Sequence, residues 1–487
     1  MKTQLSTLTA GIVCLTPFAL AIAQSAAPTA APPASAGLVN DWLRPQNDAW
    51  KAWDLGGQVR LRFEDKEHMA IPGLSGAMDF RDHRADTSNA YELLRTKVHV
   101  GWRAADWLSV YGEGRDSRSW NDKRTPEPEE DLFDLHQAFL VIGDPKKFPV
   151  TAKVGRQELV YGDERLIGAS NWNNLARVFD AAKLRFENSA FGLDTFLGRV
   201  VVPRDDHFNV PNDYDWFWGA YFSTKKLLPK QETQLYFLGR NASAQSPSAV
   251  TGGLIGLATP RDIYTAGLRA KSLPGQLRGF DYSLELAGQF GRFQESATSA
   301  SLDHQAFAAH VAGGYTWEEA APKPRLGAEY NFASGDSNPN DNKHQTFENL
   351  FPTNHKFYGF MDFFSWQNLH DMRFSVSAKP AKPLQVSLDY HLFWLADTAD
   401  YFYQVNGAAR TGAVAGSGAG YTRNPTYDSF VGSELDLVAT YSPRPWVNLQ
   451  AGYGHFFVGN YVKQSLAATT HGTADANWFY VQATLNF

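Results

Sequence analysis

The chain has 487 residues, of which 14% are aromatic and 20% carry a charge, and its mean hydropathy is −0.36. These values exclude a polytopic helical membrane protein, because no segment after the N-terminal region offers roughly 18 consecutive apolar residues. A single cysteine excludes a disulfide framework and a cysteine-based metal site. The net charge of −6 provides no global basic field that would attract nucleic acid.

The N-terminal residues have the pattern of an export signal. Lys2 precedes an apolar run over 8–23 that ends in Ala21-Ile22-Ala23, a small-x-small cleavage pattern. We therefore predict a signal peptide over 1–23, whose removal also removes Cys14. The Ala/Pro-rich and then polar stretch over 24–53 is predicted to be a linker.

From Leu55 onward, apolar and polar residues alternate with a period of two, which indicates β-strands. Leu61 and Phe63, for example, fall on one face, while Arg60 and Arg62 fall on the other. Eighteen segments of about ten residues, the length of a tilted membrane-spanning strand, show this pattern. They lie near 55–64, 91–103, 107–118, 132–143, 150–160, 177–188, 191–200, 215–224, 232–240, 262–271, 280–290, 306–316, 324–333, 370–379, 384–395, 431–442, 447–458 and 477–487.

The connections between these segments alternate between eight short turns and nine long polar loops. Short periplasmic turns and long extracellular loops are typical of outer-membrane barrels, whereas β-sandwiches rarely alternate so regularly. We predict that 54–487 form an all-β domain, a single transmembrane antiparallel β-barrel of about 18 strands. The aromatic residues would then form interfacial girdles and lipid-facing positions on its wall.

The C-terminal segment strengthens this prediction. Phe479, Val481 and Leu485 alternate with polar residues, and the chain ends in Phe487. A last strand that ends in phenylalanine resembles the signal read by the outer-membrane barrel assembly machinery. We therefore expect that machinery and outer-membrane lipid to be partners of the chain.

Basic residues lie on the polar face of several predicted strands, which would face the lumen. The parity of the strands places there Arg60, Arg62, Arg95, Lys97, Arg177, Lys183, Arg185, Arg269, Arg325 and Arg373, while the parity of Arg156 is ambiguous beside Gly155. Such residues would attract an anionic solute, and guanidinium groups match carboxylates well. The alternative is a structural ladder of ion pairs with lumenal acids. The excess of bases on the first, second and sixth strands favours the selective pore.

Two motifs resemble the alginate-export family of Gram-negative outer-membrane proteins. One runs from Val154 to Leu166 (VGRQELVYGDERL) and continues through Asn171-Trp172, Arg177 and Phe179-Asp180. The other runs from Ala333 to Asp341 (ASGDSNPND) and continues through LFPTNH over 350–355 and YGFMD over 358–362. His136-Gln137-Ala138 and GYGHFF over 452–457 are similar as well.

This resemblance implies an eighteen-stranded monomeric barrel with an Arg-lined pore that passes an anionic polysaccharide outward. It also implies that Arg156, Arg165 and Arg177, which lie inside the first motif, line the pore or its constriction. The short turns of this chain leave no room for the long periplasmic plug turn of characterised alginate exporters.

Signatures of other chemistry are absent from the sequence or incomplete. There is no H-E-x-x-H, G-x-S-x-G or P-loop motif. Asp336, Asn338, Asn340 and Asp341 are spaced loosely like a Ca²⁺ loop, but the glycine of such loops is missing, so a solvated loop is favoured. We expect no cofactor and no metal.

The sequence thus predicts a monomeric outer-membrane channel that passes an anionic solute, such as the polysaccharide alginate, by passive diffusion. The loops over 65–90, 334–369 and 396–430 would gate or narrow its outer mouth. Three alternatives remain: a substrate-specific porin for the uptake of small anions or organic compounds, an outer-membrane enzyme, and an adhesin barrel.

Overall fold

The computed structural model describes residues 37–69, 79–84, 86–124, 128–204, 207–243, 259–410 and 420–487. The predicted signal peptide over 1–23 lies outside these residues. The long strands are β1 (Trp53–Glu67), β2 (Ser88–Ala105), β3 (Leu108–Trp120), β4 (Asp131–Ile142), β5 (Val150–Gln157), β6 (Phe179–Glu187), β7 (Gly192–Val202), β8 (Val210–Thr224), β9 (Gln231–Ala242), β10 (Arg261–Ser272), β11 (Phe280–Phe293), β12 (Leu302–Thr316), β13 (Arg325–Ala333), β15 (Leu369–Ala381), β16 (Leu384–Leu395), β17 (Phe430–Arg444), β18 (Val447–Val458) and β19 (Ala476–Asn486).

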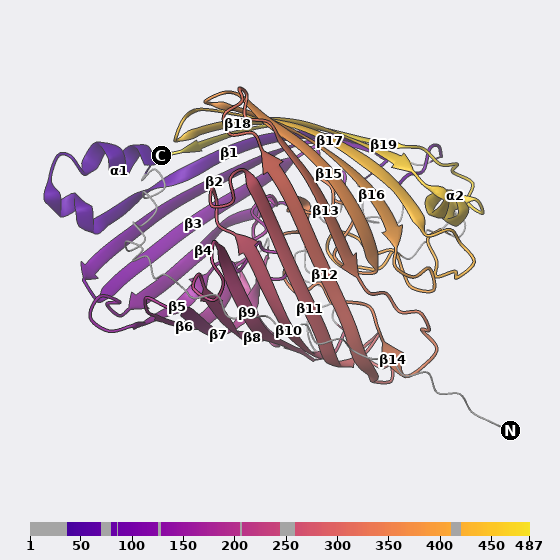
Figure 1. The fold of residues 1–487 in the computed structure, drawn as a ribbon, viewed down its shortest axis with the longest axis horizontal. Helices are drawn as coiled ribbons and strands as arrows, with labels where there is room; N and C mark the ends of the chain where they lie inside the picture. The colour runs from indigo at the N-terminus through magenta and orange to yellow at the C-terminus, as the bar shows by residue number, and fades with distance from the viewer. Residues whose placement is uncertain are drawn as a thin grey trace, which may run out of the picture. The chain divides into compact units, whose positions relative to one another are not determined.

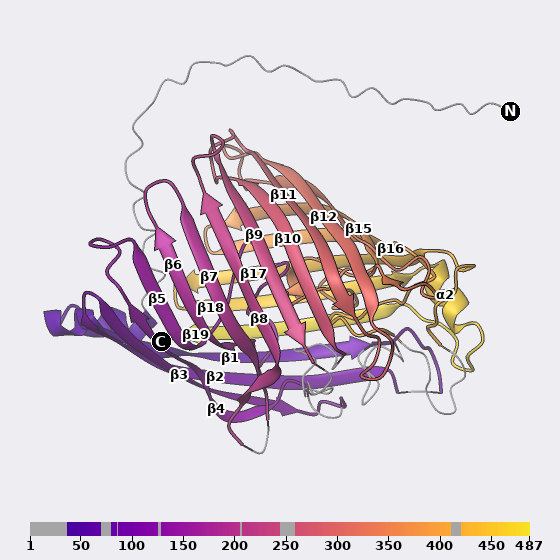
Figure 2. The ribbon, with the colours of Figure 1, turned by 90° about the horizontal axis from the view of Figure 1, so that it is seen from below.

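These eighteen strands form one closed antiparallel barrel, as the sequence predicts (Figures 1 and 2). Each strand pairs with its neighbours along the chain, and β1 pairs with β19, where Gln58 lies opposite Asn486. The extra element β14 (Lys343–His344) is a two-residue strand that pairs with β12 in parallel, inside the connection between β13 and β15.

Strand parity follows the predicted alternation. Leu61 on β1, Val98 on β2 and Leu184 on β6 are exposed, whereas Arg62 and Arg95 are buried. Apolar side chains therefore cover the outer wall, and polar side chains face the interior. No helix among the described residues is long and apolar enough to cross a membrane.

Eight turns of two to eight residues lie at one end of the barrel, and the nine connections at the other end have seven to 35 residues. The C-terminus and the helix α1 (Gly37–Leu43) are at the short-turn end, and the helix α2 (Asn460–Leu466) is at the opposite end (Figure 1).

The region before β1 differs from the predicted linker. Its described part folds into α1 and the 3-10 helix η1 (Asp48–Ala52). Asn40 is buried, donates to Asp54 Oδ1 at 2.7 Å and accepts from the N–H of Leu55 at 2.9 Å. Arg44, directly after the helix, donates to Trp53 O at 3.2 Å, so polar side chains dock α1 on β1 in a way that the Ala/Pro-rich composition does not indicate.

A hydrophobic core lies within the barrel rather than outside it. Inward-facing Phe217, Phe393 and Phe456 join one buried cluster with Phe351 and Trp366, which belong to the long connection between β13 and β15. That connection, which also contains the 3-10 helix η2 (Asn354–Lys356), therefore folds into the lumen.

Candidate functional site

Two connections fill part of the lumen: residues 158–178, called the first lumen loop, and residues 334–368, called the second lumen loop. The first lumen loop is bound to β1 and β2 by three arginines. Arg60 Nη1 donates to Asn171 O at 2.7 Å, Arg62 Nη1 donates to Trp172 O at 2.7 Å, and Arg95 Nη1 donates to Asn173 O at 3.2 Å.

These three arginines point into the barrel, as parity predicts, but they are not open to solvent. Their exposed fractions are 4% for Arg60, 1% for Arg62 and 4% for Arg95. Arg62 Nε also lies 2.8 Å from Glu64, and Arg115 on β3 binds Asp131 and Leu175 O. The expectation of a water-exposed basic ladder fails at these positions because loop carbonyls, rather than water, occupy the lumen in front of them.

The far end of the first lumen loop reaches the opposite wall. Arg165 Nη2 donates to Glu329 Oε1 on β13 at 2.7 Å and Nη1 donates to Asn331 Oδ1 at 3.1 Å. Asp163 pairs with Arg269 and Lys271 on β10, each at 2.7 Å. Although burial opposes this, the hydrogen bonds and charges of Arg269 and Lys271 lower the pKa of Asp163 to about 2. The loop thus crosses from β1–β3 to β10–β13.

The second lumen loop is bound by acids as well as by bases. Glu434 Oε1 accepts from the N–H of Met361 at 2.9 Å, and Asp436 Oδ2 accepts from the N–H of Phe360 at 3.2 Å, both from β17. At its other end, Glu348 pairs with Arg240 and Arg261, each at 2.7 Å. Against the effect of burial, these two guanidinium groups lower the pKa of Glu348 to about 2.

The two lumen loops contact each other directly. Phe351 N donates to Leu166 O at 3.0 Å, and Arg177 Nη1 donates to Gly168 O and to Pro352 O at 3.0 and 2.8 Å. Arg177 therefore joins the loops to each other. Together the loops form a continuous partition that spans the lumen.

A three-layer stack ties this partition to the wall. The ring of Trp172 lies between the guanidinium carbon of Arg62, 3.9 Å from its centroid, and the ring of His355, 4.0 Å away at 8°. Both faces of the indole are therefore covered. Beside the stack, Lys356 pairs with Glu164 at 2.8 Å and keeps half of its side chain exposed.

Asp400, from a third connection over 396–429, binds the second lumen loop. Its carboxylate accepts from the N–H groups of Asp336 and Tyr401 and from the hydroxyls of Thr346 and Tyr403. Burial raises the pKa of Asp400 to about 6, against the effect of these hydrogen bonds. Asp336 also accepts from the N–H of Asn338, and Asp341 from the N–H of Lys343, as in ordinary turns.

The remaining predicted bases on the strands have acidic partners. Lys97 lies 3.4 Å from Glu113, Lys183 lies 3.7 Å from Asp194, and Arg185 lies 2.9 Å from both Asp194 and Glu187. Arg325 lies 2.6 Å from Asp281, and Arg373 lies 2.8 Å from Asp389. These pairs are the ion-pair ladders of the structural alternative, and the role of the bases in selectivity stays a prediction.

Arg156 does not point into the lumen. It pairs with Asp180, at 2.8 Å between Nε and Oδ1, and Asp180 has the parity of exposed Leu184 on β6. The cause is the regular alternation of β5, in which Arg156 has the same outward parity as exposed Val154. The next residue, Gln157, is fully buried and donates to Ala181 O. The expectation that Arg156 lines the pore is therefore wrong.

Several interior residues were not expected from the sequence. Lys153 lies on the inner face because it alternates with exposed Val154. Glu434 and Asp436 are acids rather than bases, and they accept from backbone N–H groups of the second lumen loop. Trp172 and His355 lie within the two motifs, where aromatic residues in a polar loop are a signal of packing.

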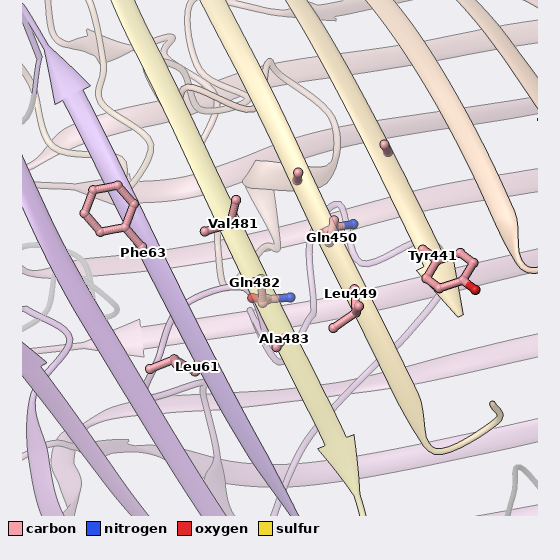
Figure 3. A pocket seen from close by; sticks show the side chains of 10 residues that line it. Leu61, Phe63, Tyr441, Leu449, Gln450, Val481, Gln482 and Ala483 are labelled. Atoms are coloured by element: carbon pink, nitrogen blue, oxygen red, sulfur yellow. The ribbon is translucent and has the colours of Figure 1, made fainter. Parts of the chain in front are cut away.

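One groove of about 470 Å³ lies on the outer wall rather than in the lumen (Figure 3). Its apolar lining comes from β1, β17, β18 and β19 and includes Leu61, Phe63, Leu449 and Val481, all on the lipid-facing side. Among the described residues, no group of three or more His, Cys, Asp or Glu side chains could hold a metal ion.

Comparison with known proteins gives a consistent picture. A family model described as alginate export matches residues 53–474. Solved structures with a similar fold include Pseudomonas aeruginosa OpdK with vanillate, which is 11% identical, has a TM-score of 0.53 and covers 89% of this chain and 98% of its own. OccD3 (OpdP) of the same species is 12% identical, has a TM-score of 0.52 and covers 90% of this chain and 91% of its own. The search of curated proteins found no match.

Proposed function

Because the chain belongs to the alginate export family and forms an outer-membrane β-barrel channel, we propose that it passes a carboxylate-bearing anionic solute by passive diffusion. Conduction of this kind needs several weak sites, since one tight site would block the pore. No step of chemistry on the solute is required.

The observation that carries this proposal is the unequal exposure within lumenal ion pairs. In Lys183–Asp194 the exposed fractions of the side chains are 26% and 5%, in Arg373–Asp389 they are 21% and 3%, and in Lys271–Asp163 they are 47% and 20%. In these three pairs the base is the more exposed partner, whereas in Arg325–Asp281 the acid is, so a solute close to the three pairs would meet the base first. A low-dielectric wall focuses the resulting field into the lumen.

The size of the solute is inferred from the two lumen loops. They span the interior from β1–β3 to β10–β13, so only part of the cross-section of the barrel remains for transport. This geometry favours a small organic anion. The solved OpdK structure contains vanillate, which is such an anion. A linear polyuronate is the second candidate, and the description of the family favours it.

Planar bilayers containing the purified full chain would test this proposal. A salt gradient should give a reversal potential of the sign expected for anions, and benzoate should compete with chloride more strongly than an oligouronate does. Stronger block by the oligouronate would favour the second candidate. A cation-selective or non-conducting barrel would contradict the proposal.

We also propose that the chain acts as a monomer and that Phe487 is read during assembly. In the barrel, Phe487 exchanges two backbone hydrogen bonds of 2.9 Å with Gly57. Replacement of Phe487 by serine should lower the amount of barrel in the outer membrane of expressing cells. Equal amounts of the two proteins would contradict the proposed role.

A further inference from the structure

A row of partly exposed side chains crosses the inner face of β2–β6. It consists of His99, Tyr111, Phe139, Lys153 and Lys183 and is called the aromatic–lysine row. The rings of His99 and Tyr111 are stacked 5.6 Å apart, and those of Tyr111 and Phe139 are stacked 4.9 Å apart at 18°. Lys153 Nζ then lies 3.7 Å from the centroid of Phe139.

The row borders the first lumen loop only at its Lys183 end, where Lys183 Nζ lies 5.7 Å from the centroid of the Tyr161 ring. Lys153 is the fourth residue of β5, which begins at the short turn after β4, so it lies about 10 Å from that end of the barrel. Unlike buried Arg60 and Arg95, which bind carbonyl groups of the first lumen loop, the members of the row keep part of their surface accessible to the interior.

The two lysines are placed directly opposite each other in the register of β5 and β6. Like charges directly opposite each other destabilise a sheet unless each has a partner. Lys183 shares Asp194 with Arg185, at 3.7 and 2.9 Å, and Arg185 also binds Glu187. Within the described part of the chain, no carboxylate lies within 4 Å of Lys153, and Glu158 acts on it only from farther away. Lys153 is therefore the member of this pair of lysines that lacks an anion in direct contact.

The rings add a preference for shape. Because Tyr111 and Phe139 are stacked side by side, and the ammonium of Lys153 lies over Phe139, their faces are covered and their edges remain available. Ring edges carry partial positive charge and contact the face of another ring in an edge-to-face arrangement. Such edges suit the face of a flat, electron-rich ring that carries a negative group.

We propose that the aromatic–lysine row is a subsite for a small anion whose carboxylate is attached to a ring. The carboxylate lies between Lys153 and Lys183, and the ring lies across the edges of Phe139 and Tyr111. This inference rests on the proposed function, and it names Lys153, Lys183 and Phe139 as residues that determine specificity.

Single-channel recordings of the full chain in planar bilayers test the subsite, with benzoate as the ring carboxylate, glucuronate as a sugar-ring carboxylate and acetate as the carboxylate without a ring. The wild type should be blocked by benzoate at lower concentration than by acetate. Lys153→Gln removes a charge without breaking an ion pair, so it should weaken block by benzoate about two- to fivefold. The matched control is Lys226→Gln, an exposed lysine in the turn after β8, which should leave block unchanged.

A second variant separates the ring from the charge. Phe139→Leu should reduce the ratio of benzoate to acetate block about two- to fivefold, because one edge-to-face contact is lost. Acetate block should stay as in the wild type. Circular dichroism and the unfolding midpoint should show that both variants fold as barrels.

The outcomes distinguish this inference from the proposed function. An anion-selective wild type that does not distinguish benzoate from acetate, or a Lys153→Gln variant that behaves like Lys226→Gln, would overturn the subsite alone. A wild type without anion selectivity would overturn the proposed function and the subsite with it. Stronger block by glucuronate than by acetate, lost in Lys153→Gln, would support the subsite and extend it to sugar acids.

Discussion

The strands β1–β3 and the strand β17 bind the two lumen loops with opposite chemistry. On the first side, the guanidinium groups of Arg60, Arg62 and Arg95 donate to backbone carbonyls of residues 171–173. On the other side, the carboxyl groups of Glu434 and Asp436 accept from backbone N–H groups of Met361 and Phe360.

This difference shows what buried charge does in the barrel. A loop inside a lumen brings backbone groups that have lost water, and each group needs a partner. Arginine side chains donate hydrogen bonds to the carbonyl groups that have lost water, and carboxylates accept hydrogen bonds from the N–H groups that have lost water. A buried base on the inner wall therefore indicates that carbonyl groups of a loop lie in front of it. Selectivity is proposed only for the bases that remain exposed.

Loss of Arg62 should have the largest effect. Arg62→Ala leaves Trp172 O without its arginine donor and removes one of three partners of Glu64, which keeps Lys66 and Trp478, so the free energy of unfolding in lipid vesicles should fall by about 3 kcal/mol. Conductance should rise because the first lumen loop is released. Arg103→Ala, an exposed arginine near the end of β2, is the control, and an equal effect there would contradict the distinction between buried and exposed bases.

Loss of Glu434 should have a smaller effect, confined to the second lumen loop. Glu434→Leu leaves the N–H of Met361 buried without an acceptor, which should cost about 1–3 kcal/mol. Hydrogen exchange should increase at 359–362 and stay unchanged at 171–173. Glu434→Gln retains a carbonyl oxygen and should restore protection at Met361; if the glutamine variant exchanges as fast as the leucine variant, the acceptor role is wrong.

Acidification should affect the two sides differently. Because the pKa of Asp400 is raised to about 6 in the folded chain, the folded state binds its proton more readily than the unfolded state does. Stability is therefore gained as the pH falls from 7 to 5, by about 1 kcal/mol, and is lost again as the pH rises through 6. The protection factor for hydrogen exchange at 344–348, which corrects for the intrinsic pH dependence of the exchange rate, should rise over this range, while that at 171–173 should not change.

Asp400→Asn is the control for this pH dependence. The asparagine does not titrate, so the step near pH 6 should disappear from exchange at 344–348. Burial also raises the pKa of Asp336, so protection at 344–348 should keep a smaller pH dependence in Asp400→Asn. A step that persists unchanged in Asp400→Asn would assign the titration to another group.

The coupling between the two loops should be the smallest effect. A double-mutant cycle with Trp172→Leu and His355→Ala should give an interaction energy of about 0.5–1 kcal/mol for the stacked rings. Chemical unfolding of the four proteins measures it. Additive losses would show that the sides of the lumen are independent, despite the contact between the loops.

The wall was predictable from the sequence because a period of two is a local pattern. Every one of the eighteen long strands overlaps a predicted segment, and the pairing of β1 with β19 follows from an even strand number. The inward direction of Arg60, Arg62 and Arg95 follows from the same alternation.

The contents of the lumen were not predictable, because they depend on contacts between distant residues. Arg62 binds Trp172, 110 residues away, and Arg165 binds Glu329, 164 residues away. Alternation says that an arginine points inward, but it does not say whether water or a loop lies there. In β5, regular alternation continues through Gly155 and places Arg156 with exposed Val154 on the outer face and Lys153 on the inner face.

The seam between β1 and β19 has a consequence for the order of folding. It joins residues such as Gln58 and Asn486, 428 positions apart, whereas most other strand pairs join chain neighbours. Closing so long a chain segment carries the largest entropic cost of any pairing in the sheet. Until β19 arrives, β1 presents a free edge that could recruit a strand from another molecule. Barrel closure is therefore expected to be the slow step, and protection of this edge is a requirement that the other strands do not share.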